Sequence, residues 1–117
     1  MSKHRFSQEY GGCLLFVEQT APNVWQGSVY EERFEEVPLR NESGVVYLQR
    51  RQVTQWERFI CLDEKCAKRC ALTTVENRLR LYKREVPKPG VWLDRSGEAD
   101  DEWTGELERR TFPGKLT

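Results

Sequence analysis

The chain has one histidine, no apolar run of membrane length and no net charge. His4 is that single histidine, so chemistry that needs several imidazoles has no candidates here. The motifs of a nucleophile elbow, a phosphate-binding loop, a dinucleotide-binding turn and a zinc protease are also missing from the sequence. We therefore predict a protein that is not an enzyme.

The longest apolar run is Cys13–Val17, which has the length of a strand and is far short of the ~20 residues of a membrane span. The first ten residues contain too few apolar side chains for the hydrophobic part of a secretion signal. We therefore expect a protein without membrane association that resides in the cytoplasm or nucleus. Because these compartments are reducing, the four cysteines are expected to be thiols or metal ligands rather than disulfides.

The zero net charge results from cancellation between blocks of opposite sign. Residues 49–88 carry eleven Lys and Arg against five carboxylates, a net +6, whereas residues 89–108 carry one Arg against seven carboxylates, a net −6. Residues 31–48 have a net charge of −3 and the last nine residues +3. Such blocks govern solubility and the choice of partner rather than the fold.

Apolar patterning indicates one α+β domain with a small, mainly antiparallel sheet, one or two short helices and an extended C-terminal arm. Residues 11–19 are predicted to be a buried strand, and Val45–Leu48 a strand that follows a hairpin loop at Arg40–Gly44. Residues 24–39 are predicted to be a strand to about Tyr30 with a short helical or irregular continuation. In total we expect three to five strands.

Two later segments fit more than one structure. Residues 53–62 are typical of a strand, but Trp56, Phe59 and Ile60 also share one side of a helix that would begin near Thr54. Arg78–Lys83 alternates apolar and basic residues at period two, which predicts a half-exposed strand.

Pro87–Gly90 would interrupt any regular element, and this divides the chain in two. We predict a compact α+β domain over residues 1–86 and an acidic C-terminal arm over residues 87–117. The arm is expected to be partly disordered or packed on the domain, and Trp92 and Trp103 argue against complete disorder.

Three cysteines lie within ten residues in the pattern Cys61-x4-Cys66-x3-Cys70. Zinc takes four ligands, so these three thiols with Cys13 or His4 as the fourth form a possible site. The irregular spacing, and the i, i+4 relation of Cys66 and Cys70, equally fit small thiols on one side of a helix. We therefore predict no cofactor, with zinc as the alternative.

The same region contains Trp56-x4-Cys61-x4-Cys66-Ala67-Lys68-Arg69, followed by Thr73-Thr74. Over these roughly 20 residues it resembles part of a FLYWCH-type zinc finger, a family that binds DNA or proteins. Those fingers end with a His-x-His pair, and this chain has no histidine after His4. We therefore do not assign the chain to that family.

Two surfaces are candidates for binding. The arm places aromatic rings among carboxylates, which suits docking into an apolar groove with basic rims. Its candidate partner-binding residues are Trp92, Asp94, Asp100, Asp101, Glu102 and Trp103.

The basic segment, residues 49–88, interleaves cations with aromatic rings, as proteins that bind single-stranded nucleic acid do. Its candidate residues are Arg50, Arg51, Trp56, Lys68, Arg69, Arg80 and Lys83.

The sequence thus favours a protein-interaction domain of adaptor or inhibitor type that binds through its charge-segregated C-terminal half. The expected partner is another protein. The alternative is a module for RNA or single-stranded DNA, with or without a cysteine-bound zinc. The oligomeric state stays open.

Overall fold

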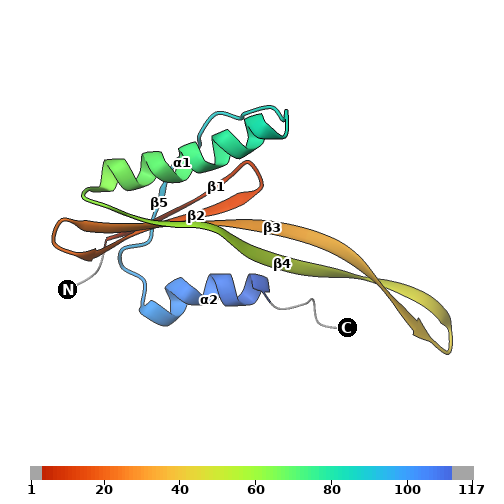
Figure 1. The fold of residues 1–117 in the computed structure, drawn as a ribbon. Coiled ribbons are helices and arrows are strands. Elements are labelled where there is room, and N and C mark those ends of the chain that lie inside the picture. Colours follow the sequence, from red (N-terminus) through yellow and green to blue (C-terminus); the bar gives the residue numbers. More distant parts are fainter. Residues whose placement is uncertain (1–3, 112–117) are drawn as a thin grey trace.

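The computed structural model describes residues 4–111; from residue 104 onward, the exposure of individual residues is described only for Gly105 and Leu107. A five-stranded antiparallel sheet in the order β4-β3-β2-β1-β5 lies between two helices (Figure 1). The elements are β1 (Arg5–Tyr10), β2 (Cys13–Ala21), β3 (Val24–Asn41), β4 (Gly44–Cys61), α1 (Glu64–Leu81), β5 (Leu93–Asp94) and α2 (Asp100–Thr111). This confirms the predicted α+β class.

Strands β1 to β4 form a meander in which each strand pairs with the next one along the chain. Gly11 and Gly12 link β1 to β2 with φ angles of 58° and 82°. A tight hairpin turn with two positive φ angles favours glycine at both positions. The predicted hairpin loop before Val45 is also confirmed, because β3 ends at Asn41 and β4 begins at Gly44.

Strand β2 is the centre of the core because both of its faces are buried. Leu15 and Val17 face α1, and Leu14 and Phe16 face α2 on the other side of the sheet. Successive side chains of a strand point to opposite faces, so a strand covered on both sides reads as a continuous apolar run. The run Cys13–Val17 is that strand, as the sequence predicts.

Helix α1 begins at the N-cap Asp63, whose carboxylate accepts a hydrogen bond of 2.7 Å from the backbone N–H of Cys66. Its buried stripe repeats every fourth residue: Ala67, Ala71, Val75 and Leu79. The helix ends where the backbone N–H of Arg84 bonds to the carbonyl of Leu79, with Lys83 at a φ of 55°.

Arg78–Lys83, predicted to be a strand, belongs instead to the last turn of α1 and its cap. The alternation spans only these six residues, too few to distinguish the period of two of a strand from the period of 3.6 of a helix. Leu79 continues the buried helical stripe, whereas Leu81 is 75% exposed. The strand interpretation of residues 53–62 is confirmed to Cys61, and the helix starts only at Glu64.

Strand β3 continues to Asn41, so the helical or irregular continuation predicted after Tyr30 is wrong. That prediction rested on the mixture of acids and aromatics along one face of the segment. Pairing between β2 and β3 ends at Cys13 and Glu31, and the two-stranded ribbon beyond that point leaves the core. Because both faces there are largely exposed, mixing polar and apolar side chains costs little.

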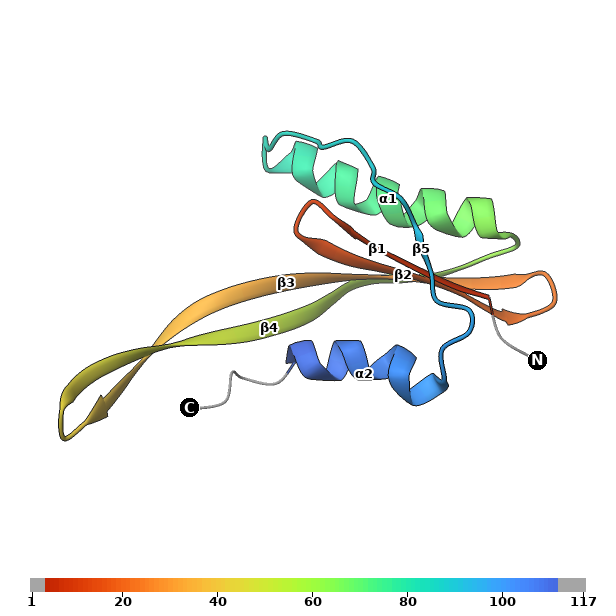
Figure 2. The ribbon, with the colours of Figure 1, turned by 180° about the vertical axis from the view of Figure 1, so that it is seen from behind.

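The chain after α1 returns along the sheet to the opposite side. Strand β5 pairs with β1 at the edge, and α2 then packs on the face opposite α1 (Figure 2). Within residues 4–111, neither helix combines the length and the apolar content that crossing a membrane would take.

Candidate metal centre and binding surfaces

Three cysteines converge at the junction of β4 and α1. Cys61 is the last residue of β4, and Cys66 and Cys70 lie in the first two turns of α1 on the same side of the helix. The Sγ atoms of Cys61 and Cys70 are 3.8 Å apart, and all three Sγ atoms lie within 4.8 Å of one another. The fold therefore brings together three thiols for which the sequence left two roles open, metal ligand or small side chain on one side of a helix.

The cluster is closed on one side and open on the other. Cys61 is buried, Cys70 is half-buried and Cys66 is exposed. Burial raises the pKa of the Cys61 thiol to about 12, and hydrogen bonds with Cys66 and Cys70 add to the rise. Without a cation, the buried thiol therefore stays protonated at neutral pH. A soft cation that replaces the proton would be held by sulfur ligands.

Neither of the two other candidate ligands belongs to this cluster. Cys13 is opposite Glu31 in the register of β2 and β3, whereas Cys61 is opposite Trp25. Six residues along β3 separate those two positions, or roughly 20 Å at ~3.3 Å per residue. Cys13 packs in a core cluster with Val75 and Leu79. His4 stacks on Trp25 with a ring-centroid separation of 6.3 Å.

The candidate nucleic-acid residues are spread over separate regions. Arg50 and Arg51 are on β4 far from α1, whereas Lys68 and Arg69 are near the start of α1 and Arg80 and Lys83 at its end. Several of these cations already have partners. Arg50 pairs with Glu35 at 3.8 Å, and Lys68 pairs with Glu64 at 3.5 Å and lies 3.7 Å from the centroid of the Phe6 ring.

Trp56 lies in a cleft of about 480 Å³ between the end of α1 and the root of the long ribbon. The guanidinium of Arg78 lies 4.3 Å from the centroid of the Trp56 ring. The indole N–H donates a 2.6 Å hydrogen bond to Glu31, which also pairs with Arg33 at 2.5 Å. The cleft therefore holds both signs of charge, and Arg78 already covers one face of the ring.

The two tryptophans of the C-terminal arm have different environments. Trp103 is 8% exposed and packs with Leu14 and Phe16, with its ring edge-on to Phe16 at 5.2 Å. Trp92 is half-buried near the core under α1, and its ring centroid lies 5.7 Å from Nζ of Lys68. Trp103 thus contributes its apolar surface to the protein's own core, and Trp92 contributes part of its surface.

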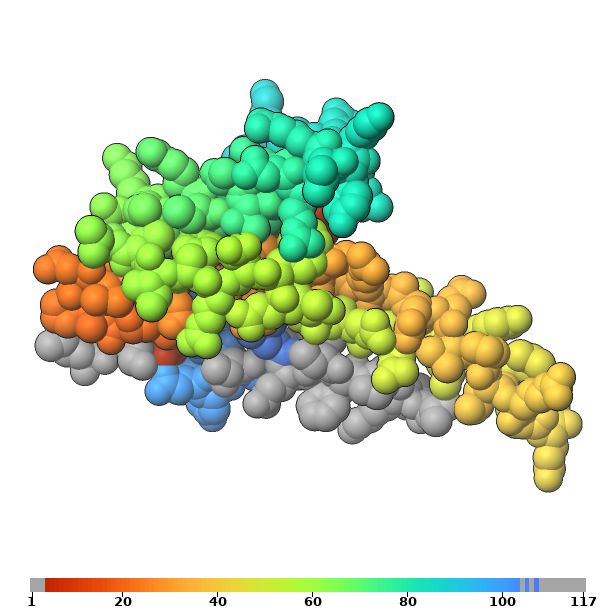
Figure 3. All heavy atoms as spheres, viewed as in Figure 1, coloured from red at the N-terminus to blue at the C-terminus, as the bar shows by residue number. Residues whose placement is uncertain are grey.

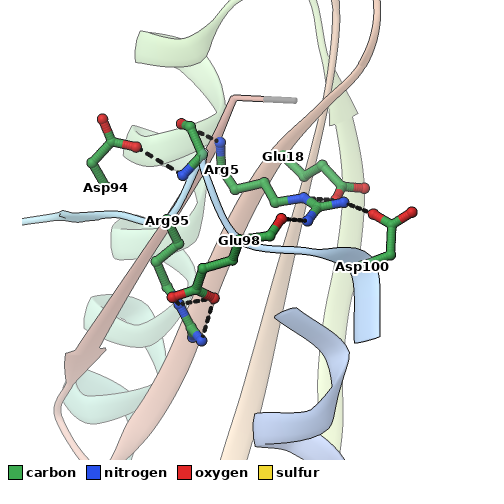
Figure 4. Close-up of polar contacts among 7 residues, drawn as sticks. Arg5, Glu18, Asp94, Arg95, Glu98 and Asp100 are labelled. Atoms are coloured by element: carbon green, nitrogen blue, oxygen red, sulfur yellow. Dashed lines mark hydrogen bonds and ion pairs between the residues drawn. The ribbon is translucent and has the colours of Figure 1, made fainter. Parts of the chain in front are cut away.

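The acidic residues of the arm meet an arginine of β1 (Figure 4). Arg5 is 3% exposed, and its guanidinium contacts Glu18 at 2.9 Å, the carbonyl of Glu98 at 3.0 Å and the carboxylate of Asp100. Arg95 forms a second ion pair with Glu98 at 2.7 Å. The partners of these carboxylates thus come from β1 and from the arm itself.

Asp100, Asp101 and Glu102 form the first turn of α2, where negative charge is favourable, and all three are exposed. Asp94 is exposed on β5, and its pKa is lowered by hydrogen bonds from Ser96. The exposed cations of α1 lie on the other side of the sheet. The carboxylates of the first turn of α2 and the exposed cations of α1 therefore lie on opposite faces of the sheet, whereas Asp94 is close enough to Lys68 for that cation to contribute to lowering its pKa.

The long ribbon ends in a polar turn, residues 40–44, flanked by exposed apolar side chains that none of the sequence patterns above indicates. We define the hairpin tip as residues 37–48; in Figure 3 it projects from the body. On one face the register pairs Val37 with Leu48 and Leu39 with Val46, and on the other it pairs Pro38 with Tyr47. Apolar residues on both sides of a predicted turn were the signal that could have found it.

The exposure of the tip is high for apolar side chains. Tyr47 is 65% exposed, Val45 49%, Val46 44% and Leu39 38%. In the described part of the chain, neither helix reaches the tip (Figures 1 and 2). A contiguous exposed apolar patch usually marks a site of contact with another molecule.

Comparison of the chain with protein-family models, curated proteins and solved structures gives no match. A function can therefore be inferred only from the geometry of the described residues.

Proposed function

We propose that this chain is a non-enzymatic protein-binding module whose hairpin tip inserts into an apolar cleft of a partner protein. The observation that carries the proposal is the exposure of apolar side chains on both faces of a ribbon outside the core. A two-stranded hairpin by itself is marginally stable in water, and exposed apolar surface adds to the cost of leaving it free. Covering the tip removes both costs.

The two-sided character of the tip favours a cleft over a flat surface. Leu39 and Val46 point to one face, whereas Tyr47 points to the other. A flat partner, or a second copy stacked face to face, would cover only one of these faces. A cleft that accepts the end of the ribbon covers both.

Charged residues form a rim behind the tip. Glu35 pairs with Arg50, and the guanidinium of Arg51 lies 5.4 Å from the centroid of the Phe34 ring. An apolar centre with a polar rim is the usual organisation of a protein interface. The mouth of the partner's cleft is therefore expected to carry charges of both signs.

The energy available from the tip sets the expected affinity. Full burial of one aliphatic side chain contributes about 1.5–3 kcal/mol, and about half of each tip side chain is still to be buried. Four such side chains give roughly 4 kcal/mol before the cost of association is subtracted. The tip alone would thus support a transient complex, and the charged faces of the body would guide the encounter and its orientation.

The proposal is tested first by site-specific photocrosslinking in cells that express the protein. A photoreactive amino acid at Tyr47 is compared with one at Val91, which is 84% exposed but lies before β5. One protein species crosslinked from Tyr47 and not from Val91 is the expected result. Self-crosslinking alone, or a crosslink that nuclease treatment removes, would overturn it.

The second step uses the purified partner. The double variant Leu39→Ser with Val46→Ser is expected to weaken binding at least about tenfold, equivalent to ~1.4 kcal/mol. Its melting temperature should be nearly unchanged, because both side chains are outside the core. The control Leu62→Ser changes a side chain that is 79% exposed in the β4–α1 bend and should bind as the wild type does. Equal binding by the tip variant and this control would contradict the proposal.

A further inference from the structure

The separation of the cysteine sulfurs at the β4–α1 junction matches the geometry of a metal–thiolate site. A tetrahedral zinc site with Zn–S bonds of ~2.3 Å places its sulfur atoms about 3.8 Å apart. The Sγ atoms of Cys61 and Cys70 are 3.8 Å apart, and no pair among the three exceeds 4.8 Å. Rotation of the exposed Cys66 side chain can supply the remaining adjustment.

We propose that Cys61, Cys66 and Cys70 bind one zinc ion through three thiolates, with water at a fourth position on the exposed side of Cys66. This inference is independent of the docking proposal, because it concerns the opposite end of β4. Three protein ligands with one open position are a known arrangement for zinc.

The positions of the three cysteines are fixed by the backbone of β4 and α1 without a metal ion. Cys61 is fixed in the register of β4 opposite Trp25. The side chain of Asp63 caps the first turn of α1 by accepting from the N–H of Cys66, and Cys70 follows one turn later. Little ordering is therefore left to oppose binding, since strand and helix are each secured by their own packing.

The electrostatics of the junction suit an anionic centre. Zn²⁺ with three thiolates carries a charge of −1, and the positive end of the helix dipole of α1 lies beside it. Zinc binds thiolates rather than thiols, so protons are displaced as the metal binds. The burial of Cys61 shields its metal–sulfur bond from water.

A disulfide between Cys61 and Cys70 is the competing use of the same atoms. In the structure both thiols are free, and a disulfide between them would leave Cys66 without a role. The metal uses all three thiols at the separation that the structure has.

The test uses the full chain, purified under reducing conditions and loaded with Zn²⁺ or Co²⁺. Native mass spectrometry is expected to show one zinc per chain, and the cobalt form the absorption of tetrahedral thiolate coordination. Zinc should raise the melting temperature, and a chelator should reverse the increase. Cys66→Ser and Cys70→Ser are expected to lose the bound zinc, whereas the matched control Cys13→Ser should keep it.

Cys66 is the decisive position because its side chain is exposed and its replacement leaves the core intact. Loss of zinc by Cys66→Ser, with the melting temperature of the chelator-treated protein unchanged, supports the site. Three results would overturn it: no bound zinc in the wild type, full retention by both single variants, or a Cys61–Cys70 disulfide in protein that takes up no metal after reduction.

Discussion

Replacement of Trp103 by alanine measures whether α2 belongs to the core or is presented to a partner. The side chain is 8% exposed, packs edge-on against Phe16 and lies 5.4 Å from the guanidinium of Arg5. Truncating a buried tryptophan typically costs about 3–5 kcal/mol, out of a total stability of roughly 5–15 kcal/mol for a domain. At roughly 3–6 °C per kcal/mol for a chain of this size, the melting temperature should fall on the order of 10–30 °C.

Thermal unfolding by circular dichroism, together with hydrogen exchange of the amides at the start of α2, gives the readout. If the variant loses only the docking of α2, hydrogen exchange at the backbone amide of residue 103 rises even where the sheet melts as before, because that N–H donates to the carbonyl of Ala99 in the first turn. Trp103→Phe keeps an aromatic ring against Phe16 and should lose much less. A Trp103→Ala protein with unchanged melting temperature and unchanged exchange would refute the placement of α2.

Three further predictions concern the body of the protein. Arg5→Met should lower the free energy of unfolding in urea titrations by about 3–5 kcal/mol, because Glu18 loses its buried partner. The ion pair of Arg33 is exposed, so the control Arg33→Ala should leave the unfolding midpoint nearly unchanged. Gly27→Ala should cost about 1–3 kcal/mol, since a methyl group there would overlap the ring of Phe59, and Phe59→Leu in the same chain should recover part of the loss. Burial raises the pKa of the Cys13 thiol to about 11 from its ordinary 9.0, so the thiol of the unfolded chain loses its proton at lower pH than that of the folded protein. The free energy of unfolding measured in urea titrations should therefore fall between pH 9 and 11. The decrease should be smaller in Cys13→Ser.

The sequence was most informative where one interaction dominates a segment. The apolar run Cys13–Val17 predicts a buried strand, and the structure shows that both faces of this strand are buried. Turn chemistry likewise placed the hairpin loop before Gly44. The sequence was misleading where the two periods overlap, because Arg78–Lys83 alternates at period two while Leu79 also continues a helical stripe that begins at Ala67. The helix that the sequence offered as an alternative would begin near Thr54, whereas the N-cap is Asp63.

The candidate sites depend on geometry that local patterns do not encode. Convergence of the three thiols requires the exact end of β4 and the start of α1, and a shift of one residue in the strand would turn Cys61 to the other face. Exclusion of Cys13 follows only from the register of β2 and β3. The exposure of the hairpin tip follows from the length of β2, which ends its pairing at Glu31 and leaves the rest of the ribbon outside the core.

The order of the elements along the chain has a consequence for biosynthesis. Strands β1 to β4 pair in the order of the chain, and α1 then packs on β2 and β3, so these elements can form while the segment after α1 is still being translated. Leu14 and Phe16 pack against Trp103 of α2, the last of the described elements along the chain. Until that helix leaves the ribosome, the nascent sheet therefore presents an apolar surface, and this stage is the one at which a chaperone would be expected to act.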